Sequence, residues 1–221
     1  MSNKICYIIG ACRENCEDFT IPPNEGNLII AADGGYDFLK KKDITPDILL
    51  GDFDSIKDIP SHPDIIKYPQ KKDDTDTFLA YKTAFDKGYK NFVVLGGVGG
   101  RFDHTIANVQ MLLNIAKSGG RAFLIGNHTI MTTVFNGKIE FSAKHKGNVG
   151  VFAQGDIAKD VDILGLKYTT NSLALAPDTP IGVSNEFIGE SATVKVGNGA
   201  VLVVWNEKYS DFISNIEDFT I

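Results

Sequence analysis

Acidic side chains recur just beyond the apolar segments in the first half of the chain, where they could bind a cation. The set comprises Asp33, Asp52, Asp54, Asp73 and Asp76. Carboxylates that gather without a counter-charge repel one another and raise each other's pKa, so a stable cluster implies a bound metal ion. Ligands that offer only oxygen suit Mg²⁺ better than zinc. The alternative is that each aspartate caps a helix or forms a turn, which is the commonest use of this residue.

A glycine-rich segment at residues 96–101 lies between an apolar run and a helical pattern, where backbone amides can hold a phosphate group. The segment lacks the lysine of a P-loop and the last glycine of a dinucleotide fingerprint, so it is weak on its own. Arg101 strengthens it because a guanidinium binds phosphate oxygens through paired hydrogen bonds. Together with the carboxylates, the segment predicts a magnesium-dependent enzyme that transfers phosphate groups from a nucleotide.

Short apolar runs in the first half predict the sheet that positions these residues. The runs are residues 5–9, 28–31, 48–50, 65–67, 92–95 and 122–125. Each run is apolar on both faces, which is typical of strands in a mostly parallel sheet. Loops that follow parallel strands emerge at one edge, where ligands bind. We therefore expect the aspartates, with Asp103 in the loop after the fifth run, to face one crevice.

Two amphipathic helices are predicted as covers for this sheet, one from Asp74 to Gly88 and one ending at residues 119–120. Their apolar stripes are Phe78, Tyr81 and Phe85, and Ile106, Val109 and Leu113. Residues 55–64 are short for a helical crossover, so the strand order near them stays open.

After about residue 127, short alternating runs with turn signals replace the helical patterns, apart from a possible short helix at residues 211–216. Asn136-Gly137 and residues 197–199 predict hairpin turns. We therefore expect an α/β domain at residues 1–127, with a mostly parallel sheet flanked by helices, followed by an all-β sandwich at residues 128–221.

The bulk composition excludes two classes of protein. A net charge of -6 and a pI near 5.2 argue against a nucleic-acid binder, which needs a basic surface to neutralise phosphates. No run approaches the ~20 apolar residues that a membrane span requires. We expect neither nucleic acid nor membrane as a partner.

The cysteines Cys6, Cys12 and Cys16 match neither a zinc pair nor a disulfide framework, which favours a reducing, cytoplasmic location. Residues 9–12 do match the cleavage box of a bacterial lipoprotein. However, the apolar run before them is shorter than most signal cores, and charged residues follow at once. Residues 5–10 are therefore interpreted as a buried first strand.

Five motifs resemble the thiamine pyrophosphokinase family in their order and spacing. They are Ala32-Asp33-Gly34-Gly35, Pro46-Asp47 leading to Gly51-Asp52-Phe53-Asp54-Ser55, Lys72-Asp73-Asp74-Thr75-Asp76, Gly96 to His104 with Asn108, and Ser184-Asn185-Glu186. One motif would mean little, but five in order span nearly the whole chain. The resemblance implies a chain with an α/β catalytic domain followed by a β-sandwich, two copies of which form a homodimer. It also implies transfer of pyrophosphate from ATP to the hydroxyl of thiamine, which yields thiamine diphosphate and AMP.

The resemblance also implies residue roles in the first domain. Asp52, Asp54 and Asp76 would hold Mg²⁺ against the triphosphate, with Asp33 and Asp73 as further ligands or as partners of the ligands. Asp54, Asp76 and Arg101 would be catalytic. The ATP-binding residues would be Asp33, Gly34, Gly97, Gly99, Gly100, Arg101, Asp103, His104 and Asn108. Alternatively, His104 is only a residue of the first helical turn without a direct role, and Asn108 has a structural role as a cap.

In the second domain the resemblance implies a thiamine site. Ser184 and Asn185 would bind the pyrimidine, across the dimer interface, although both residues are also typical of a polar turn. Trp205, the only tryptophan, could stack on the thiamine ring or on its cationic thiazolium, or it could pack in the core because it lies in an apolar strand.

Two other functions fit parts of the sequence. In a phosphatase of the haloacid dehalogenase type, Asp52 would be a covalent nucleophile at the end of an apolar strand. Ser55 stands where that pattern prefers Thr or Val, and the second domain stays unexplained. A sensor that binds a nucleotide or thiamine without turnover is the other alternative, but it would not need five carboxylates suited to a metal.

Overall fold

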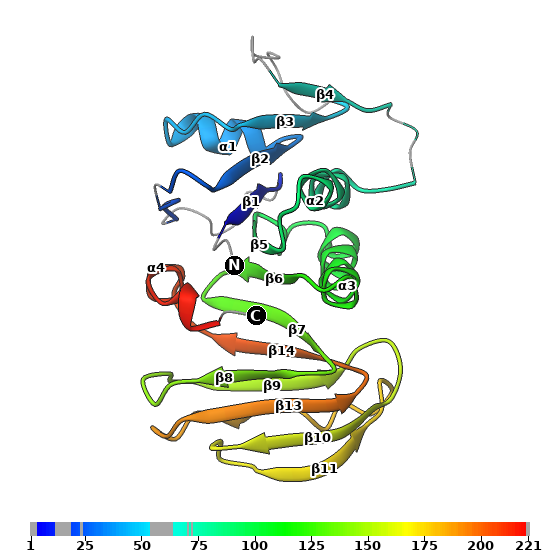
Figure 1. Cartoon of the computed structure of the whole chain (residues 1–221), viewed down its shortest axis with the longest axis vertical. Helices are drawn as coiled ribbons and strands as arrows, with labels where there is room; N and C mark the ends of the chain where they lie inside the picture. Colours follow the sequence, from blue (N-terminus) through cyan, green and yellow to red (C-terminus); the bar gives the residue numbers. More distant parts are fainter. Residues whose placement is uncertain are drawn as a thin grey trace. The chain divides into compact units, whose positions relative to one another are not determined.

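The computed structural model describes residues 4–11, 19–22, 24–53, 64–69, 71 and 73–219 (Figure 1). The chain forms two compact units. The first consists of Met1–Met111 with Ala122–Asn127, and the second of Leu112–Arg121 with His128–Ile221. Residues 112–121 therefore group with the second unit, although residues 122–127, which follow them in the chain, belong to the first.

The first unit is built on a sheet with the strand order β6-β5-β1-β2-β3-β4. The strands are β1 (Ile5–Ile9), β2 (Leu28–Ala32), β3 (Ile48–Gly51), β4 (Ile65–Lys67), β5 (Asn91–Leu95) and β6 (Arg121–Gly126). Neighbouring strands from β5 to β4 pair in parallel. Every apolar run predicted to be a strand is one, and the α/β class is confirmed. The order left open near residues 55–64 is settled too, because β4 pairs directly with β3.

One strand departs from the predicted pattern of burial on both faces. β4 has no buried residue, and Ile65 is 36% exposed, whereas every residue of β3 is buried. The reason is position, because β4 is the last strand in the sheet order and, within the described part of the chain, pairs with β3 alone.

Helices cover both faces of this sheet. They are α1 (Gly35–Lys41), α2 (Asp76–Asp86) and α3 (Phe102–Lys117). Parallel strands are joined by right-handed crossovers, and the step from β2 to β3 runs across the sheet in the opposite sense to the step from β4 to β5. Accordingly, α1 lies on one face, and α2 and the start of α3 lie on the other (Figure 1). In the described part of the chain, no helix is long and apolar enough to span a membrane.

The predicted apolar stripes of α2 and α3 were largely wrong. The buried residues are Thr77, Ala80, Tyr81 and Ala84 on α2, and Asn108, Met111, Leu112 and Ile115 on α3. Of the predicted residues only Tyr81 is buried, and Ile106 is 59% exposed. Small residues let α2 approach the strands closely, and α3 turns a different apolar stripe inward. The predicted stop of α2 is confirmed, since Gly88, at φ 89°, donates its N–H to the carbonyl of Phe85 at 2.9 Å.

The second unit contains two antiparallel sheets, with the orders β12-β9-β14-β7 and β11-β10-β13-β8. The strands are β7 (Thr129–Phe135), β8 (Lys138–Phe141), β9 (Asn148–Ala153), β10 (Ala158–Leu164), β11 (Thr170–Leu175), β12 (Asn185–Glu186), β13 (Ala192–Asn198) and β14 (Ala200–Asn206). A short helix, α4 (Tyr209–Ser214), and a 3₁₀ turn (Ile216–Phe219) follow. The rings of Phe141 on β8 and Trp205 on β14 lie 5.3 Å apart, so the two sheets pack on a shared aromatic core.

The two predicted hairpins are turns of another kind. β7 pairs with β14 and β8 with β13, so the turn at Asn136-Gly137 carries the chain from one sheet to the other. The turn between β13 and β14 does the same, and the two turns bind each other. Asn136 donates its N–H to the carbonyl of Gly199 at 3.1 Å, and Gly199 donates to Oδ1 of Asn136 at 2.8 Å. Local turn chemistry was identified correctly, but the pairing of the strands was not.

Candidate functional site

The strand order places a switch point between β1 and β5. From β1 the chain proceeds in one direction through β2, β3 and β4, and β5 and β6 lie on the other side. Ligands of open parallel sheets bind at such a point, outside the carboxyl ends of the strands. The loops after β1 and β5 touch there, since Gly10 donates its N–H to the carbonyl of Leu95 at 2.8 Å. A Cβ on Gly10 would lie 3.0 Å from the carbonyl oxygen of Gly96, so glycine permits this approach.

Two of the predicted metal ligands follow neighbouring strands at this edge. Asp33 comes directly after β2, and its N–H donates to the carbonyl of Leu50 on β3 at 2.8 Å. Asp52 comes directly after β3. Asp33 has φ 46°, a left-handed conformation that aspartate adopts more readily than most residues. A side chain at Gly51 would meet Cα of Asp33 at 3.1 Å, so glycine there leaves room for the turn.

The acidic residues of the third motif lie at the start of α2, after β4. Asp76 is the first residue of the helix, and Asp73 is exposed three residues before it. The helix cap is Thr75, whose Oγ1 accepts the N–H of Phe78 at 3.2 Å. Neither aspartate caps this helix. Asp54 lies outside the described residues.

Among the described residues, no three His, Cys, Asp or Glu side chains lie close enough to hold a metal ion. The predicted cluster is therefore not preformed by Asp33, Asp52, Asp73 and Asp76. Mg²⁺ in nucleotide enzymes usually takes one or two carboxylates, with substrate phosphates and water completing its shell. Asp33 and Asp52, oxygen donors at the ends of adjacent strands, fit that kind of site.

The glycine loop, defined here as residues 96–100, connects β5 to α3 at the switch point. Gly96, Gly99 and Gly100 have φ values of 69°, 89° and 60°, which residues with a side chain rarely adopt. The loop is bound to α3 twice. Thr105 accepts the N–H of Gly99 on its Oγ1 at 3.1 Å, and the Nδ2 group of Asn108 donates to the carbonyl of Gly97 at 2.8 Å.

Sequence reasoning missed Gly10 and Thr105. The available signals were a glycine directly after the first apolar run and a hydroxyl residue in the first turn of the helix that follows the glycines. Neither signal shows which backbone group it meets.

Arg101 and Asp103 form an ion pair at the start of α3. The guanidinium donates from Nε to Oδ1 at 3.2 Å and from Nη2 to Oδ2 at 2.5 Å. The hydrogen bonds from Arg101 lower the pKa of Asp103 below its usual value. The side chains are 71% and 64% exposed, so water screens the pair. A phosphate group can therefore replace the carboxylate on Arg101 at little cost. His104 is exposed in the same helical turn.

The predicted thiamine-binding residues lie at the start of β12. Ser184 is exposed and has φ 61°. Asn185 is 6% exposed, and its amide binds the backbone of Tyr168 on both sides, at 2.9 Å to the N–H and 2.7 Å to the carbonyl. Its Oδ1 also accepts the N–H of Glu186 at 2.9 Å. Asn185 thus fixes the loop beside β12.

A small cavity lies beside these residues in the second unit. Its volume is about 150 Å³, and Asn185, Tyr168, Gly182 and Val183 are among its lining residues. Tyr168 and Val183 are 62% and 53% exposed, so the rim offers apolar surface next to Ser184.

Trp205 lies in the aromatic core of the second unit. Its side chain is 1% exposed and packs against Phe141, Phe212 and Phe219, with ring centroids 5.3 to 6.5 Å apart. Its Nε1–H donates to Oε2 of Glu207 at 2.7 Å. Of the two roles left open for Trp205 by the sequence, these contacts support packing in the core.

A test of the core role of Trp205 is Trp205→Phe, which removes the donor to Glu207. We expect the KM for thiamine to stay within about twofold, and stability to fall by about 1–3 kcal/mol because the half-buried carboxylate of Glu207 loses a hydrogen-bond donor. Burial raises the pKa of Glu207, which disfavours its charged form in the folded chain. Protonated Glu207 depends less on the Trp205 donor, so the loss of stability in Trp205→Phe should shrink as the pH falls. Urea denaturation at pH 5 and pH 8 measures the second effect. A selective rise in the KM for thiamine would restore the original prediction.

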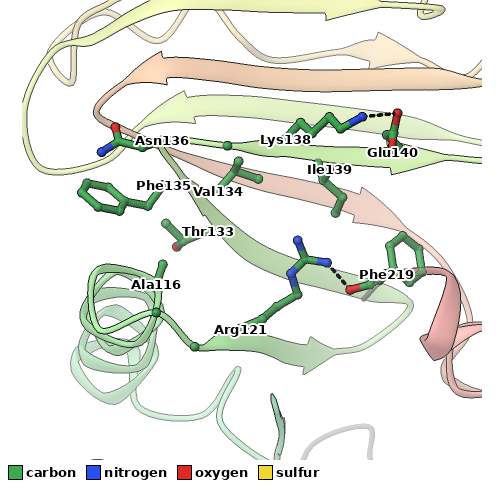
Figure 2. Close-up of a pocket in the computed structure, with 13 residues that line it drawn as sticks. Ala116, Arg121, Thr133, Val134, Phe135, Asn136, Lys138, Ile139, Glu140 and Phe219 are labelled. Atoms are coloured by element: carbon green, nitrogen blue, oxygen red, sulfur yellow. Dashed lines mark hydrogen bonds and ion pairs between the residues drawn. The ribbon is translucent and has the colours of Figure 1, made fainter. Parts of the chain in front are cut away.

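A larger pocket of about 410 Å³ in the second unit lies apart from these residues (Figure 2). Arg121 donates to the carbonyl of Phe219 across it, and Lys138 pairs with Glu140 at 2.8 Å. Burial lowers the pKa of Arg121. None of the described residues that line this pocket is a predicted site residue. Arg121 instead holds the C-terminal turn.

Two family models match the chain in order. The model described as "Thiamin pyrophosphokinase, catalytic domain" matches residues 23–124, and "Thiamin pyrophosphokinase, vitamin B1 binding domain" matches residues 137–201. This chain belongs to the thiamin pyrophosphokinase family. The first match covers the glycine loop and every predicted metal ligand, and the second covers Ser184 and Asn185. The recognition made from five short motifs is confirmed.

Individual relatives agree with the thiamin pyrophosphokinase assignment. Thiamin pyrophosphokinase 1 of Caenorhabditis elegans is 28% identical over 202 residues, which cover 84% of this chain and 82% of that protein. Thiamine pyrophosphokinase of Bacillus subtilis is 27% identical over 208 residues, with coverage of 90% and 97%. The crystal structure of thiamine pyrophosphokinase from Bacillus subtilis has a TM-score of 0.80 at 23% identity, covering 93% of this chain and 99% of that chain. The solved structure of thiamin pyrophosphokinase from Candida albicans has a TM-score of 0.70 at 19% identity, covering 93% of this chain and 90% of that chain.

Proposed function

We propose that this chain is a transferase that moves pyrophosphate from ATP to the hydroxyl of thiamine, yielding thiamine diphosphate and AMP. The observation that carries the proposal is the ordered match to both the catalytic and the vitamin B1 binding models of one family. The geometry supports it independently, because a glycine loop and two carboxylates lie at the edge of a parallel sheet where such enzymes bind ligands.

The reaction requires a divalent cation, and we propose that it is Mg²⁺. Asp33 and Asp52 would hold it together with Asp54, Asp76 and phosphate oxygens, and Asp73 would support them from the loop before α2. When bound, the ion would neutralise charge on the transferred group and align it for attack.

The chain's own residues supply binding and orientation. Amides of the glycine loop, with Gly34, would hold phosphate oxygens, and His104 would contact the nucleotide from the first turn of α3. Arg101 would exchange Asp103 for phosphate and stabilise the negative charge that builds up during transfer. Asp103 would return to Arg101 once the products leave.

Ser184 is proposed to bind the pyrimidine of thiamine, since it is exposed and lies in the chain between Val183 and Asn185, which line the cavity near Tyr168. Ser184→Ala should raise the KM for thiamine by about tenfold, because one hydrogen bond to a polar ligand group is lost, and leave the KM for ATP unchanged. Alanine at φ 61° meets the same backbone cost as serine, so stability should change little. Steady-state kinetics with each substrate varied separately measure both constants. Equal rises in the two values would argue against a thiamine contact.

Other features of the proposal rest on the family resemblance. They are a homodimer with thiamine bound across its interface, a cytoplasmic location, and the division of labour between a catalytic region at residues 1–127 and a thiamine-binding region at residues 128–221. Sedimentation of the purified chain tests the first of these.

The phosphatase alternative, with Asp52 as a covalent nucleophile, is not favoured by the family assignment. Incubation with ATP, Mg²⁺ and thiamine followed by chromatography separates the possibilities. AMP and thiamine diphosphate in equal amounts support the proposal. Inorganic phosphate as the main product would indicate the phosphatase, and unchanged substrates would indicate a sensor.

A further inference from the structure

The backbone conformation of the glycine loop is not fixed by its own residues. Three of its glycines have positive φ values, and glycine has more conformational freedom to lose than any other residue. Such a loop presents its amides to a phosphate in one arrangement only if neighbouring groups fix it. The side chains of Thr105 and Asn108 on α3 do so, and we call this pair the clasp.

The geometry of the clasp is specific. Asn108 is 4% exposed, and its Nδ2 group donates to the carbonyl of Gly97 at 2.8 Å. A Cβ added to Gly97 would lie 2.9 Å from that nitrogen and 2.8 Å from Leu124, so the loop backbone lies directly against both side chains. Thr105 receives the N–H of Gly99 two residues further along. The two bonds thus tie Gly97 and Gly99 to residues about one turn apart on α3.

The burial of Asn108 distinguishes a positioning role from direct contact with the nucleotide. A side chain that is 4% exposed and already bound to the loop is poorly placed to touch a nucleotide, in contrast to the exposed Arg101. We propose that Asn108 is a positioning residue that acts on the triphosphate through the glycine loop, with Thr105 as its partner. This inference rests on the proposed function for its catalytic readout only.

Asn108→Leu tests the clasp because leucine has a similar size but cannot donate a hydrogen bond. We expect the KM for ATP to rise by about five- to tenfold, as the loss of one buried hydrogen bond allows. The KM for thiamine should stay within about twofold. Asn114→Leu is the matched control, since it makes the same change at an exposed position of the same helix and should alter neither constant.

Hydrogen exchange supplies a readout that needs no activity. In the absence of substrates, amides of residues 96–100 should exchange faster in Asn108→Leu than in the parent chain, and those of β1 should not. A purely structural residue would change both KM values together or accelerate exchange across the whole unit. Either result, or an ATP KM and loop exchange equal to those of the parent, would overturn the proposal.

Thr105→Val keeps the test decisive if Asn108→Leu fails to fold. Valine has nearly the same shape and removes only the acceptor of the Gly99 N–H, so the same selective rise in the KM for ATP and in loop exchange is expected. Unchanged values in Thr105→Val would then contradict the clasp. If the parent chain forms no AMP, the proposed function fails, while exchange in the loop still tests the clasp on its own.

Discussion

Asp52→Asn should lower the rate of AMP formation by about two to three orders of magnitude, since a bound metal ion contributes several kcal/mol to transition-state stabilisation. Asparagine has nearly the same size, but its neutral amide is a poor ligand for Mg²⁺. Asp52 directly follows β3, beside the turn at Asp33. The fold should remain intact. Product formation at saturating ATP, together with circular dichroism, measures both parts.

The matched control is Asp43→Asn. Asp43 is exposed, lies before β3 and therefore at the opposite end of the strand, and has φ 57°, which asparagine tolerates equally well. Its variant should retain the parent rate. Full activity in Asp52→Asn would remove this residue from the metal site, and equal losses in the two variants would point to a general effect of charge.

Gly35→Ala should destabilise the first unit by about 3 kcal/mol or more, because the new methyl group has no space. A Cβ on Gly35 would lie 2.0 Å from the carbonyl oxygen of Ile9 and 3.2 Å from that of Gly10. Both atoms belong to the backbone of β1 and its loop, so neither can move aside as a flexible side chain would. The start of α1 would have to shift away from the switch point. Activity should fall with stability, since Asp33 is two residues away.

Urea denaturation monitored by hydrogen exchange shows which of the two units Gly35→Ala destabilises. This matters because a chain with two compact units need not unfold in one step. Gly137→Ala serves as the comparison. The nearest atom to its Cβ would be the carbonyl oxygen of Phe135 at 3.5 Å, an ordinary contact, so a change within about 0.5 kcal/mol is expected. A Gly35→Ala chain as stable as the parent would show that α1 is not seated as described.

Short-range patterns in the sequence were sufficient to identify the strands. Buried parallel strands are apolar on both faces, and that signal located each strand of the first unit that the structure describes. It could not show that β4 is an edge strand, because edge position depends on what pairs beside it. The hairpins predicted at Asn136 and Gly199 were wrong for the same reason. Their local chemistry is that of a hairpin, but strand partners far along the chain place their flanking strands in different sheets.

The helix α3 shows why the site was harder to predict than the fold. Its sequence carries two apolar stripes, one through Ile106 and one through Met111 and Ile115, and periodicity does not decide which is buried. The second stripe is interrupted by the polar Asn108. It is buried because the carbonyl of Gly97 receives its amide, a contact that only the folded loop creates. The contacts of Asn185 were unpredictable for the same reason, since its partner Tyr168 lies in another segment.

The central claim is that the chain transfers the terminal two phosphates of ATP as one unit. The most direct measurement uses ATP labelled at the β-phosphorus, incubated with Mg²⁺, thiamine and the purified chain, with products separated by chromatography. We predict that the label appears in thiamine diphosphate and that AMP accumulates in equal amount without label. Label that remains in ADP, with inorganic phosphate released, would contradict pyrophosphate transfer and assign the site to simple phosphate hydrolysis.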